Sequence, residues 1–91
     1  MTIRVAVADG QPLVLEGFAT IVSRAPDLDL TGQAADGEAA VRLAREVRPD
    51  VFLMDVRMPF LDGIEATRRI TSDPDTTSVK VLILTTFDLD E

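Results

Sequence analysis

Three side chains able to take part in phosphoryl or metal chemistry stand at similar places in the chain. Asp9, Asp55 and Thr85 each follow directly after a short apolar run. Two carboxylates held close together repel each other, which raises the pKa of at least one of them unless a divalent cation neutralises the pair, and hard oxygen ligands of this kind suit Mg²⁺. A carboxylate beside such a cation can attack a phosphoryl group and form an acyl phosphate. The three residues therefore predict a phosphoryl-transfer site, provided that the fold brings them together.

A purely structural interpretation of these residues stays open. Asp is common after strands because its side chain caps helices and forms Asx turns, and this explanation is preferred for any single Asp. Two carboxylates and a hydroxyl at equivalent places together favour a site. Turns or helix caps are sufficient explanations for the Asp residues that stand beside Gly or Pro or at a helix start, which are Asp36, Asp50, Asp62 and Asp88.

The composition removes several other kinds of chemistry. Among the 91 residues there is no Cys and no His, so the sequence offers no disulfide, thiolate nucleophile, zinc–thiolate site or imidazole base. Sixteen acidic residues against nine basic ones give a net charge of −7, which repels phosphate backbones and anionic membranes. We therefore expect no direct nucleic-acid contact and no membrane binding by these residues. No run reaches the length of a membrane span and the first residues lack a signal-peptide pattern, so we expect a cytoplasmic domain.

Apolar periodicity predicts four strands that alternate with three helices. The first helix should turn toward the sheet the apolar residues Val14, Phe18, Ile21, Val22 and Ala25. In the third helix Ile64, Thr67 and Ile70 should share a side. Strands that alternate with helices form a parallel α/β sheet, whose ligands bind beyond the carboxyl ends of the strands where the winding reverses. If the winding of the chain reverses between the first and third strands, Asp9 and Asp55 are neighbours. The expected strands are 3–8, an edge strand from 28 that closes at 36–37, 51–54 and 79–84, and the expected helices are 12–25, 38–48 and 64–72.

These residues and their spacing resemble the receiver domain of bacterial two-component response regulators, most closely the NarL/FixJ type. The resemblance runs through the whole chain, and the block from Met54 to Pro59 followed by Asp62-Gly63 is its most specific part. The segments that carry it are Ile3-Arg-Val-Ala-Val-Ala-Asp9, Leu13-Val-Leu-Glu-Gly-Phe18, Ala34-Ala-Asp-Gly-Glu38, Arg48-Pro-Asp-Val-Phe-Leu-Met-Asp-Val-Arg-Met-Pro59, Asp62-Gly-Ile-Glu-Ala66 and Val81-Leu-Ile-Leu-Thr-Thr-Phe-Asp88.

The resemblance implies a flavodoxin-like (CheY-like) fold, a doubly wound parallel sheet with the family strand order 2-1-3-4-5. Because the chain supplies only four of these strands, residues 1–91 are expected to be an incomplete receiver domain. Helix 4, strand 5, helix 5 and any helix-turn-helix output domain would then follow residue 91. An attached output domain of that kind would bind DNA, which reconciles an acidic receiver with control of transcription.

The resemblance also implies roles for single residues and partners. Asp55 would accept a phosphoryl group from a histidine kinase, and Thr85 would be the switch hydroxyl that turns toward it. Asp9, Asp55 and the backbone carbonyl of Arg57 would hold Mg²⁺. The domain would then act in phosphorelay signalling as a non-enzymatic response regulator, with a histidine kinase and an output domain as partners. A second copy of the chain is also expected as a partner, because an exposed edge at the fourth strand favours dimerisation.

One departure from the family pattern weakens the predicted metal site. The family has two adjacent acids after the first strand, but here the second position is Gly10. Mg²⁺ retains waters readily, so water, Asp9 or the side-chain amide of Gln11 could partly compensate, although the site loses one negative charge and should bind the cation more weakly. An atypical, phosphorylation-independent receiver that serves as a ligand- or partner-controlled interaction module therefore stays open as an alternative function.

An aspartyl hydrolase is disfavoured as a further alternative, because it would need an acid two residues after Asp55, where Arg57 stands.

Overall fold

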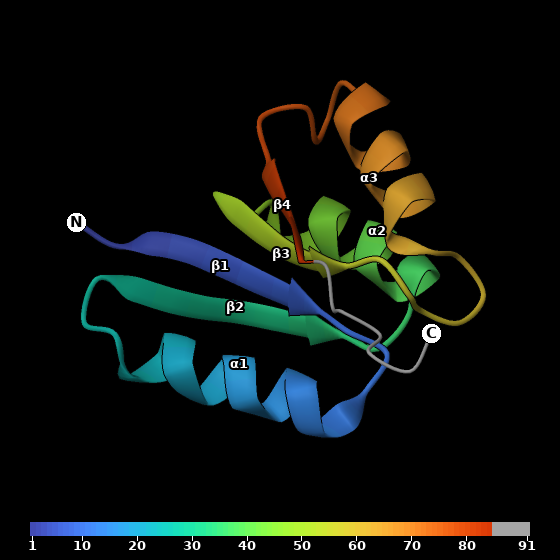
Figure 1. The fold of residues 1–91 in the computed structure, drawn as a ribbon. Coiled ribbons are helices and arrows are strands. Elements are labelled where there is room, and N and C mark those ends of the chain that lie inside the picture. Colours follow the sequence, from blue (N-terminus) through green and yellow to red (C-terminus); the bar gives the residue numbers. More distant parts are fainter. Residues whose placement is uncertain (85–91) are drawn as a thin grey trace.

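The computed structural model describes residues 1–84, which form a four-stranded parallel sheet covered by helices on both faces (Figure 1). The strand order is β2-β1-β3-β4, so the winding reverses between β1 and β3 as predicted. The elements are β1 (Ile3–Ala8), α1 (Pro12–Arg24), β2 (Leu28–Ala34), α2 (Gly37–Val47), β3 (Val51–Asp55), α3 (Gly63–Ser72) and β4 (Lys80–Leu84).

The predicted elements are all present, with shifts at their ends. The edge position predicted for β2 is confirmed, and this strand pairs with β1 through a register irregularity between Val5 and Ala6. The strand β3 continues one residue further than predicted, to Asp55, and α2 begins one residue earlier, at Gly37. Arg48, predicted as the last helical residue, instead caps α2 in the left-handed conformation with φ 43°. Such one-residue differences are ordinary at helix and strand ends.

The two helix caps predicted for Asp36 and Asp62 are confirmed. The Asp36 side chain accepts a hydrogen bond from the backbone N–H of Ala39, and the Asp62 side chain accepts one from Glu65. The turn predicted at Asp50 also uses its carboxylate, which accepts the backbone N–H of Arg4. The cap residues thus satisfy free amides in the first turns of α2 and α3.

A large apolar cluster lies between the sheet and the layer formed by α2 and α3. Its residues come from β1, β2, β3, both helices and the segment before β4, and Phe52 and Met54 of β3 are fully buried within it. Alanines at Ala40, Ala44 and Ala66 allow these helices to approach the sheet closely, since each is completely buried. This packing fixes the position of β3, the strand that ends at Asp55.

A smaller apolar cluster lies on the opposite face of the sheet, beneath α1. It contains the buried residues Val5, Val7 and Val22, with half-buried neighbours from α1, β2 and β3. The predicted sheet-facing side of α1 is confirmed at Val22, which is buried, but it is wrong at Ile21, which is 66% exposed. The predicted inward side of Ile64 is also wrong: Ala66 and Ile70 define the buried face of α3, and Ile64 is 56% exposed.

None of the helices formed by residues 1–84 combines the length and the apolar character that crossing a membrane requires.

Candidate functional site

The register of the sheet places the two candidate carboxylates side by side. Ala8 of β1 pairs with Met54 of β3, so the next residues, Asp9 and Asp55, lie at adjacent positions beyond these strands' paired ends. Both side chains are buried, with exposed fractions of 2% for Asp9 and 5% for Asp55. The predicted convergence of these two residues is therefore confirmed, and it occurs at the point where the winding of the sheet reverses.

Asp9 also has a structural role, which the alternative interpretation anticipated. One oxygen of its carboxylate, Oδ1, accepts a hydrogen bond of 2.8 Å from the backbone N–H of Gln11. This contact forms an Asx turn that leads into α1. The carboxylate retains a second oxygen and further lone pairs, so the turn does not prevent Asp9 from contacting a cation.

The pKa of Asp55 is raised above its ordinary value. Burial is the main cause, since it removes water from the charged form, and the negative charge of Asp9 adds to it. Hydrogen bonds from the backbone N–H groups of Val56 and Arg57 favour the carboxylate and offset part of the effect. The fold therefore holds a carboxylate in an environment that favours a positive counter-charge beside it.

The loop between β3 and α3 carries the third oxygen of the predicted cation site, the carbonyl of Arg57. Hydrogen bonds hold this loop at two places: Gly63 donates its backbone N–H to the carbonyl of Val56, and Leu61 donates to the carbonyl of Pro59. The second bond closes a tight turn around Phe60, which has φ 69°. A bulky residue rarely adopts this left-handed conformation, so the loop has a specific and constrained shape.

Three glycines pack against this loop, and the sequence analysis assigned none of them this role. Gly10, Gly37 and Gly63 come from different parts of the chain, and a Cβ atom added at any of them would press on loop atoms or on the backbone of Asp55. The Asp-Gly pairs at 36–37 and 62–63 were interpreted only as turns and caps. One sequence feature could have indicated the role of Gly37 and Gly63. Each stands directly after an Asp cap, at the first helical position, where a residue with a higher helix propensity would otherwise be expected.

The oxygen atoms of this site are of the kind that Mg²⁺ prefers. Two buried carboxylates and a backbone carbonyl could hold the cation, with waters completing its coordination. No group of three or more His, Cys, Asp or Glu side chains able to hold a metal ion occurs within residues 1–84. The two carboxylates and the carbonyl oxygen therefore fit a cation of this kind. The predicted switch residue Thr85, together with Asp88, lies outside the described residues.

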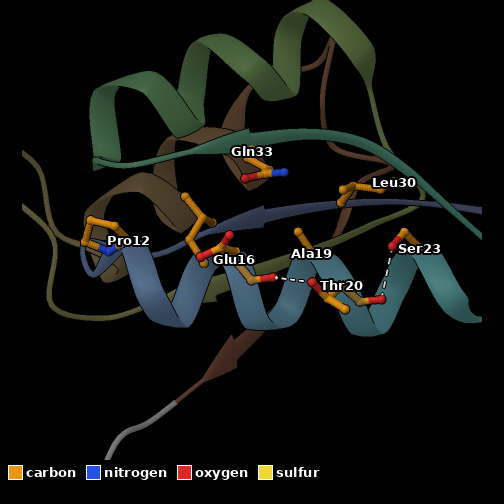
Figure 2. A pocket seen from close by; sticks show the side chains of 8 residues that line it. Pro12, Glu16, Ala19, Thr20, Ser23, Leu30 and Gln33 are labelled. Atoms are coloured by element: carbon orange, nitrogen blue, oxygen red, sulfur yellow. Dashed lines mark hydrogen bonds between the residues drawn. The ribbon is translucent and has the colours of Figure 1, made fainter.

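A groove of about 470 Å³ lies away from these carboxylates, between α1 and the edge strand β2 (Figure 2). The hydroxyls of Thr20 and Ser23 along its wall donate to backbone carbonyls within α1, at distances of 3.0 Å. Both hydroxyl groups are therefore already hydrogen-bonded within α1. The lining residues are Pro12, Leu15, Glu16, Ala19, Thr20, Ser23, Leu30 and Gln33.

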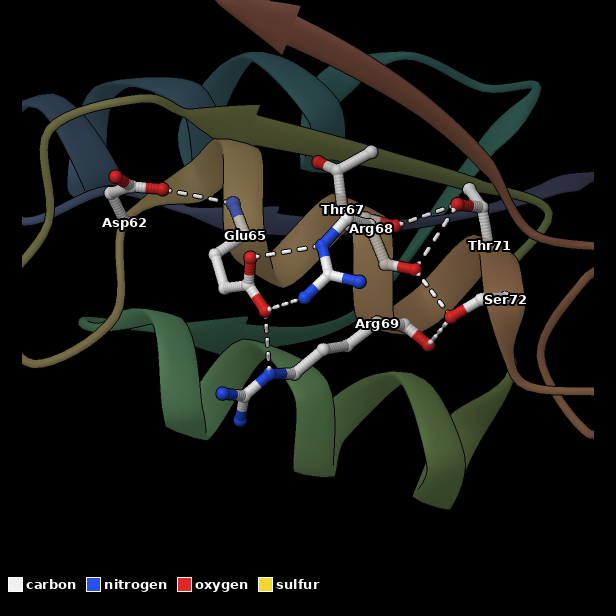
Figure 3. Close-up of polar contacts among 7 residues, drawn as sticks. All are labelled: Asp62, Glu65, Thr67, Arg68, Arg69, Thr71 and Ser72. Carbon is white, nitrogen blue, oxygen red and sulfur yellow. Dashed lines mark hydrogen bonds and ion pairs between the residues drawn. The ribbon is translucent and has the colours of Figure 1, made fainter.

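The outer surface of α3 carries a cluster of paired charges (Figure 3). Glu65 accepts hydrogen bonds from the guanidinium groups of Arg68 and Arg69, and these contacts lower the pKa of Glu65. Both arginines are more than half exposed, so they lie on a solvated face of α3. Exposed pairs of this kind contribute little to stability.

Known proteins are similar to this chain in both sequence and fold. The sequence model of the response regulator receiver domain family matches residues 5–91. The transcriptional regulatory protein YxjL of Bacillus subtilis (strain 168) is 49% identical over 89 residues, which are 98% of this chain and 40% of that protein. The chain spans about 40% of the length of the curated relatives it matches.

Two solved structures extend the similarity to the fold. The response regulator domain of Thermotoga maritima CheB has a TM-score of 0.87 and 35% identity, covering 93% of this chain and 61% of that chain. A LuxR-family two-component response regulator from Aurantimonas sp. SI85-9A1 has a TM-score of 0.86 and 36% identity, covering 97% of this chain and 61% of that chain. These values agree with the strand order and with the resemblance identified in the sequence.

Proposed function

The chain belongs to the response regulator receiver domain family, and from this premise we propose that Asp55 accepts a phosphoryl group from a histidine kinase. The observation that carries the proposal is the buried pair of Asp9 and Asp55 at the point where the sheet winding reverses. In this step a carboxylate oxygen of Asp55 forms a bond to phosphorus. The bond between phosphorus and the donor imidazole nitrogen breaks, and its electron pair leaves with that nitrogen.

The environment of Asp55 determines what this transfer needs. The attacking group must be the carboxylate, but burial and the charge of Asp9 raise the pKa of Asp55 and disfavour that form. Mg²⁺, when held by Asp9, Asp55 and the carbonyl of Arg57, would supply the positive charge that stabilises the carboxylate and the transferred phosphoryl group. The backbone N–H groups of Val56 and Arg57 assist by orienting Asp55 and stabilising its charged form.

A second candidate function is supported by Gly10. Without a carboxylate at this position, residues 1–84 bring two acidic side chains to the site, and one oxygen of Asp9 already accepts the N–H of Gln11. A receiver with such a site could act without phosphorylation, as a module controlled by a ligand or a partner. In either role the domain accepts or relays a signal and is not an enzyme; the exposed Arg57 stands where an aspartyl hydrolase would need its second acid.

The remaining partners belong to the same proposal. Matched relatives named as transcriptional regulatory proteins are longer than this chain, which supports a receiver domain continued by a DNA-binding output domain. The exposed apolar side chains of Leu13 and Ile21 on α1 support contact with a second copy. The absence of Cys suits a reducing compartment, which supports a cytoplasmic location.

The intact mass of the protein after incubation with a small acyl-phosphate donor tests the proposal directly. We expect a gain of one phosphoryl group that requires both Mg²⁺ and Asp55. The Asp55→Asn variant should show no gain, whereas Asp29→Asn, a change at an exposed carboxylate of β2, should behave as the parent protein does. An unmodified parent protein, indistinguishable from Asp55→Asn, would contradict phosphorylation and favour the phosphorylation-independent module.

A further inference from the structure

The first residue of α3 lies directly against the backbone of the proposed phosphoacceptor. A Cβ atom at Gly63 would lie 1.9 Å from the carbonyl oxygen of Asp55 and 2.8 Å from its carbonyl carbon, far inside van der Waals contact. Both opposing atoms belong to the backbone, so they cannot rotate away as the end of a flexible side chain could. Gly63 therefore allows α3 to begin in direct contact with the end of β3.

Space, and not backbone conformation or helix propensity, accounts for glycine at this position. No glycine among residues 1–84 has a positive φ, so no left-handed conformation requires glycine here. Alanine has the higher helix propensity, by up to about 1 kcal/mol in a helix interior. The start of α3 is also already capped by Asp62, whose carboxylate accepts the N–H of Glu65. The nearness of the Asp55 carbonyl is therefore what excludes a side chain at Gly63.

The packing on either side determines which atoms a side chain at position 63 would move. The helix α3 is fixed on the sheet by Ala66, which is fully buried. The strand β3 is fixed by the fully buried Met54, the last residue of this strand that pairs with β1. The peptide between Asp55 and Val56 lies between these two fixed parts. Because a Cβ atom and an oxygen need at least about 3 Å, this peptide would have to move by roughly 1 Å.

The same peptide orients the reactive carboxylate. The backbone N–H groups of Val56 and Arg57 donate hydrogen bonds to the carboxylate of Asp55. The carbonyl of Val56 in turn accepts the N–H of Gly63 at 2.8 Å, which ties this turn to α3. A shift of roughly 1 Å in the peptide would therefore break these hydrogen bonds or move the carboxylate relative to Asp9.

We infer that Gly63 is a positioning residue for Asp55: because position 63 carries no side chain, the first turn of α3 holds the Asp55–Val56 peptide and so fixes the Asp55 carboxylate beside Asp9. The inference rests on the proposed function, since it concerns the orientation of the residue that accepts the phosphoryl group. The start of α3 thus has a task at the site in addition to its packing on the sheet.

Two substitutions of glycine by alanine test the inference. Gly63→Ala adds a methyl group against the Asp55 carbonyl, whereas Gly17→Ala adds the same group on α1, where nothing lies within 4 Å. Intact mass measures the rate of phosphoryl gain from a small acyl-phosphate donor, and calorimetric titration measures Mg²⁺ affinity. We expect Gly63→Ala to react about a hundredfold more slowly, as a misplacement near 1 Å can cause, and to bind Mg²⁺ about tenfold more weakly. Gly17→Ala should stay within about twofold of the parent protein in both measurements.

A second pair of variants separates positioning from a general loss of structure. Asp62→Ala removes the cap of α3 and loosens its first turn without adding a clash, whereas Asp62→Asn removes the same charge but keeps a capping side chain. We expect Asp62→Ala to react several-fold more slowly and to bind Mg²⁺ more weakly than Asp62→Asn, which should resemble the parent protein. Urea unfolding identifies the folded variants. A merely structural role would lower the free energy of unfolding but leave the reaction rate and Mg²⁺ affinity of the folded protein unchanged.

The outcomes separate this inference from the proposed function. Parent-like rate and affinity in Gly63→Ala would overturn the inference, and so would equal values in Asp62→Ala and Asp62→Asn. If Gly63→Ala does not fold, the pair at Asp62 decides by the same two measurements. A parent protein that binds Mg²⁺ but gains no phosphoryl group would overturn the proposed function, and an affinity loss confined to Gly63→Ala and Asp62→Ala would then leave the inference standing. A parent protein that neither binds Mg²⁺ nor gains a phosphoryl group would overturn both.

Discussion

The two faces of the sheet differ in how tightly their helices pack, although both use the same central strands. Among residues 1–84, the cluster under α2 and α3 contains eleven buried residues, whereas the cluster under α1 contains three. The difference arises in the helices. The alanines Ala40, Ala44 and Ala66 of α2 and α3 are fully buried, but α1 buries only Val22 and turns Leu13 and Ile21 outward. The apolar content of a helix therefore does not by itself predict how much of it is buried.

The same contrast appears at the helix ends. The helices α2 and α3 begin with Asp side chains that accept backbone N–H groups, while α1 begins after Gln11, which forms no side-chain cap. Pro12 compensates in part, because a proline in the first helical turn needs no partner for an N–H group. The loop after Asp55 is thus attached to the more firmly packed and better capped layer of the molecule.

Two neighbouring residues of β3 provide the strongest test of this contrast. Phe52 belongs to the cluster under α2 and α3 and is fully buried, whereas Leu53 packs in the α1 cluster and is half-buried. We expect Phe52→Ala to lower the free energy of unfolding by about 3–5 kcal/mol, as complete removal of a buried aromatic side chain does. Leu53→Ala should cost roughly 1–2 kcal/mol, because part of its surface is already exposed. Urea unfolding of both variants measures the difference, and equal losses would show that the two layers contribute alike.

Changes at the helix caps should have smaller effects on the free energy of unfolding. A change at α2 should lower it, and a change at α1 should raise it. Asp36→Ala removes the side chain that accepts the N–H of Ala39, and should lower the free energy of unfolding by about 1 kcal/mol. Gln11→Ser introduces a cap at α1, where none exists, and should raise it by up to about 1 kcal/mol. Thermal unfolding followed by circular dichroism measures both. A destabilised Gln11→Ser variant would indicate that the start of α1 is already optimal.

The sequence was sufficient to predict the order of the elements, the strand order and the approach of Asp9 to Asp55. Continuous apolar runs predict strands buried on both faces, and the reversal of winding follows from the resemblance and from the rules for parallel sheets. The caps at Asp36 and Asp62 were also predictable, because the residue type and the following helix together specify them. Local patterns that repeat over several residues are therefore the most reliable part of the prediction.

Contacts between distant segments could not be predicted in this way. The helical period correctly placed Val22 on the sheet-facing side of α1, but it also placed Ile21 there, and in α3 the buried residue is Ala66 and not Ile64. The rotation of each helix on the sheet decides between these neighbours. The glycine contacts with the β3–α3 loop join residues far apart in sequence, and no single-sequence pattern encodes the space around them. The Mg²⁺ site and the switch role of Thr85 remain predictions, the latter outside the described residues.

The smallest expected change is the pH dependence of the free energy of unfolding that arises from Asp55, at the end of β3. The pKa of Asp55 is raised in the folded protein, mainly by burial and then by the charge of Asp9, so folding favours its protonated form. Stability from this group is fully present below the ordinary Asp pKa of about 3.9 and is lost as pH rises through the raised folded value. Two backbone N–H groups, of Val56 and Arg57, oppose the shift and limit this loss.

Asp55→Asn removes the titration while it keeps the size of the side chain. The free-energy difference between Asp55→Asn and the parent protein should therefore grow in favour of the variant as pH rises from about 3, and level off above the folded pKa of Asp55. Urea unfolding at a series of pH values measures it, with Asp29→Asn as the exposed control that should show no such growth. Saturating Mg²⁺ should reduce the difference at neutral pH, because the cation binds the carboxylate form that only the parent protein supplies. A difference independent of pH would mean that the carboxylate at the end of β3 is solvated as well as an exposed one, and that the packing around β3 does not extend to the site.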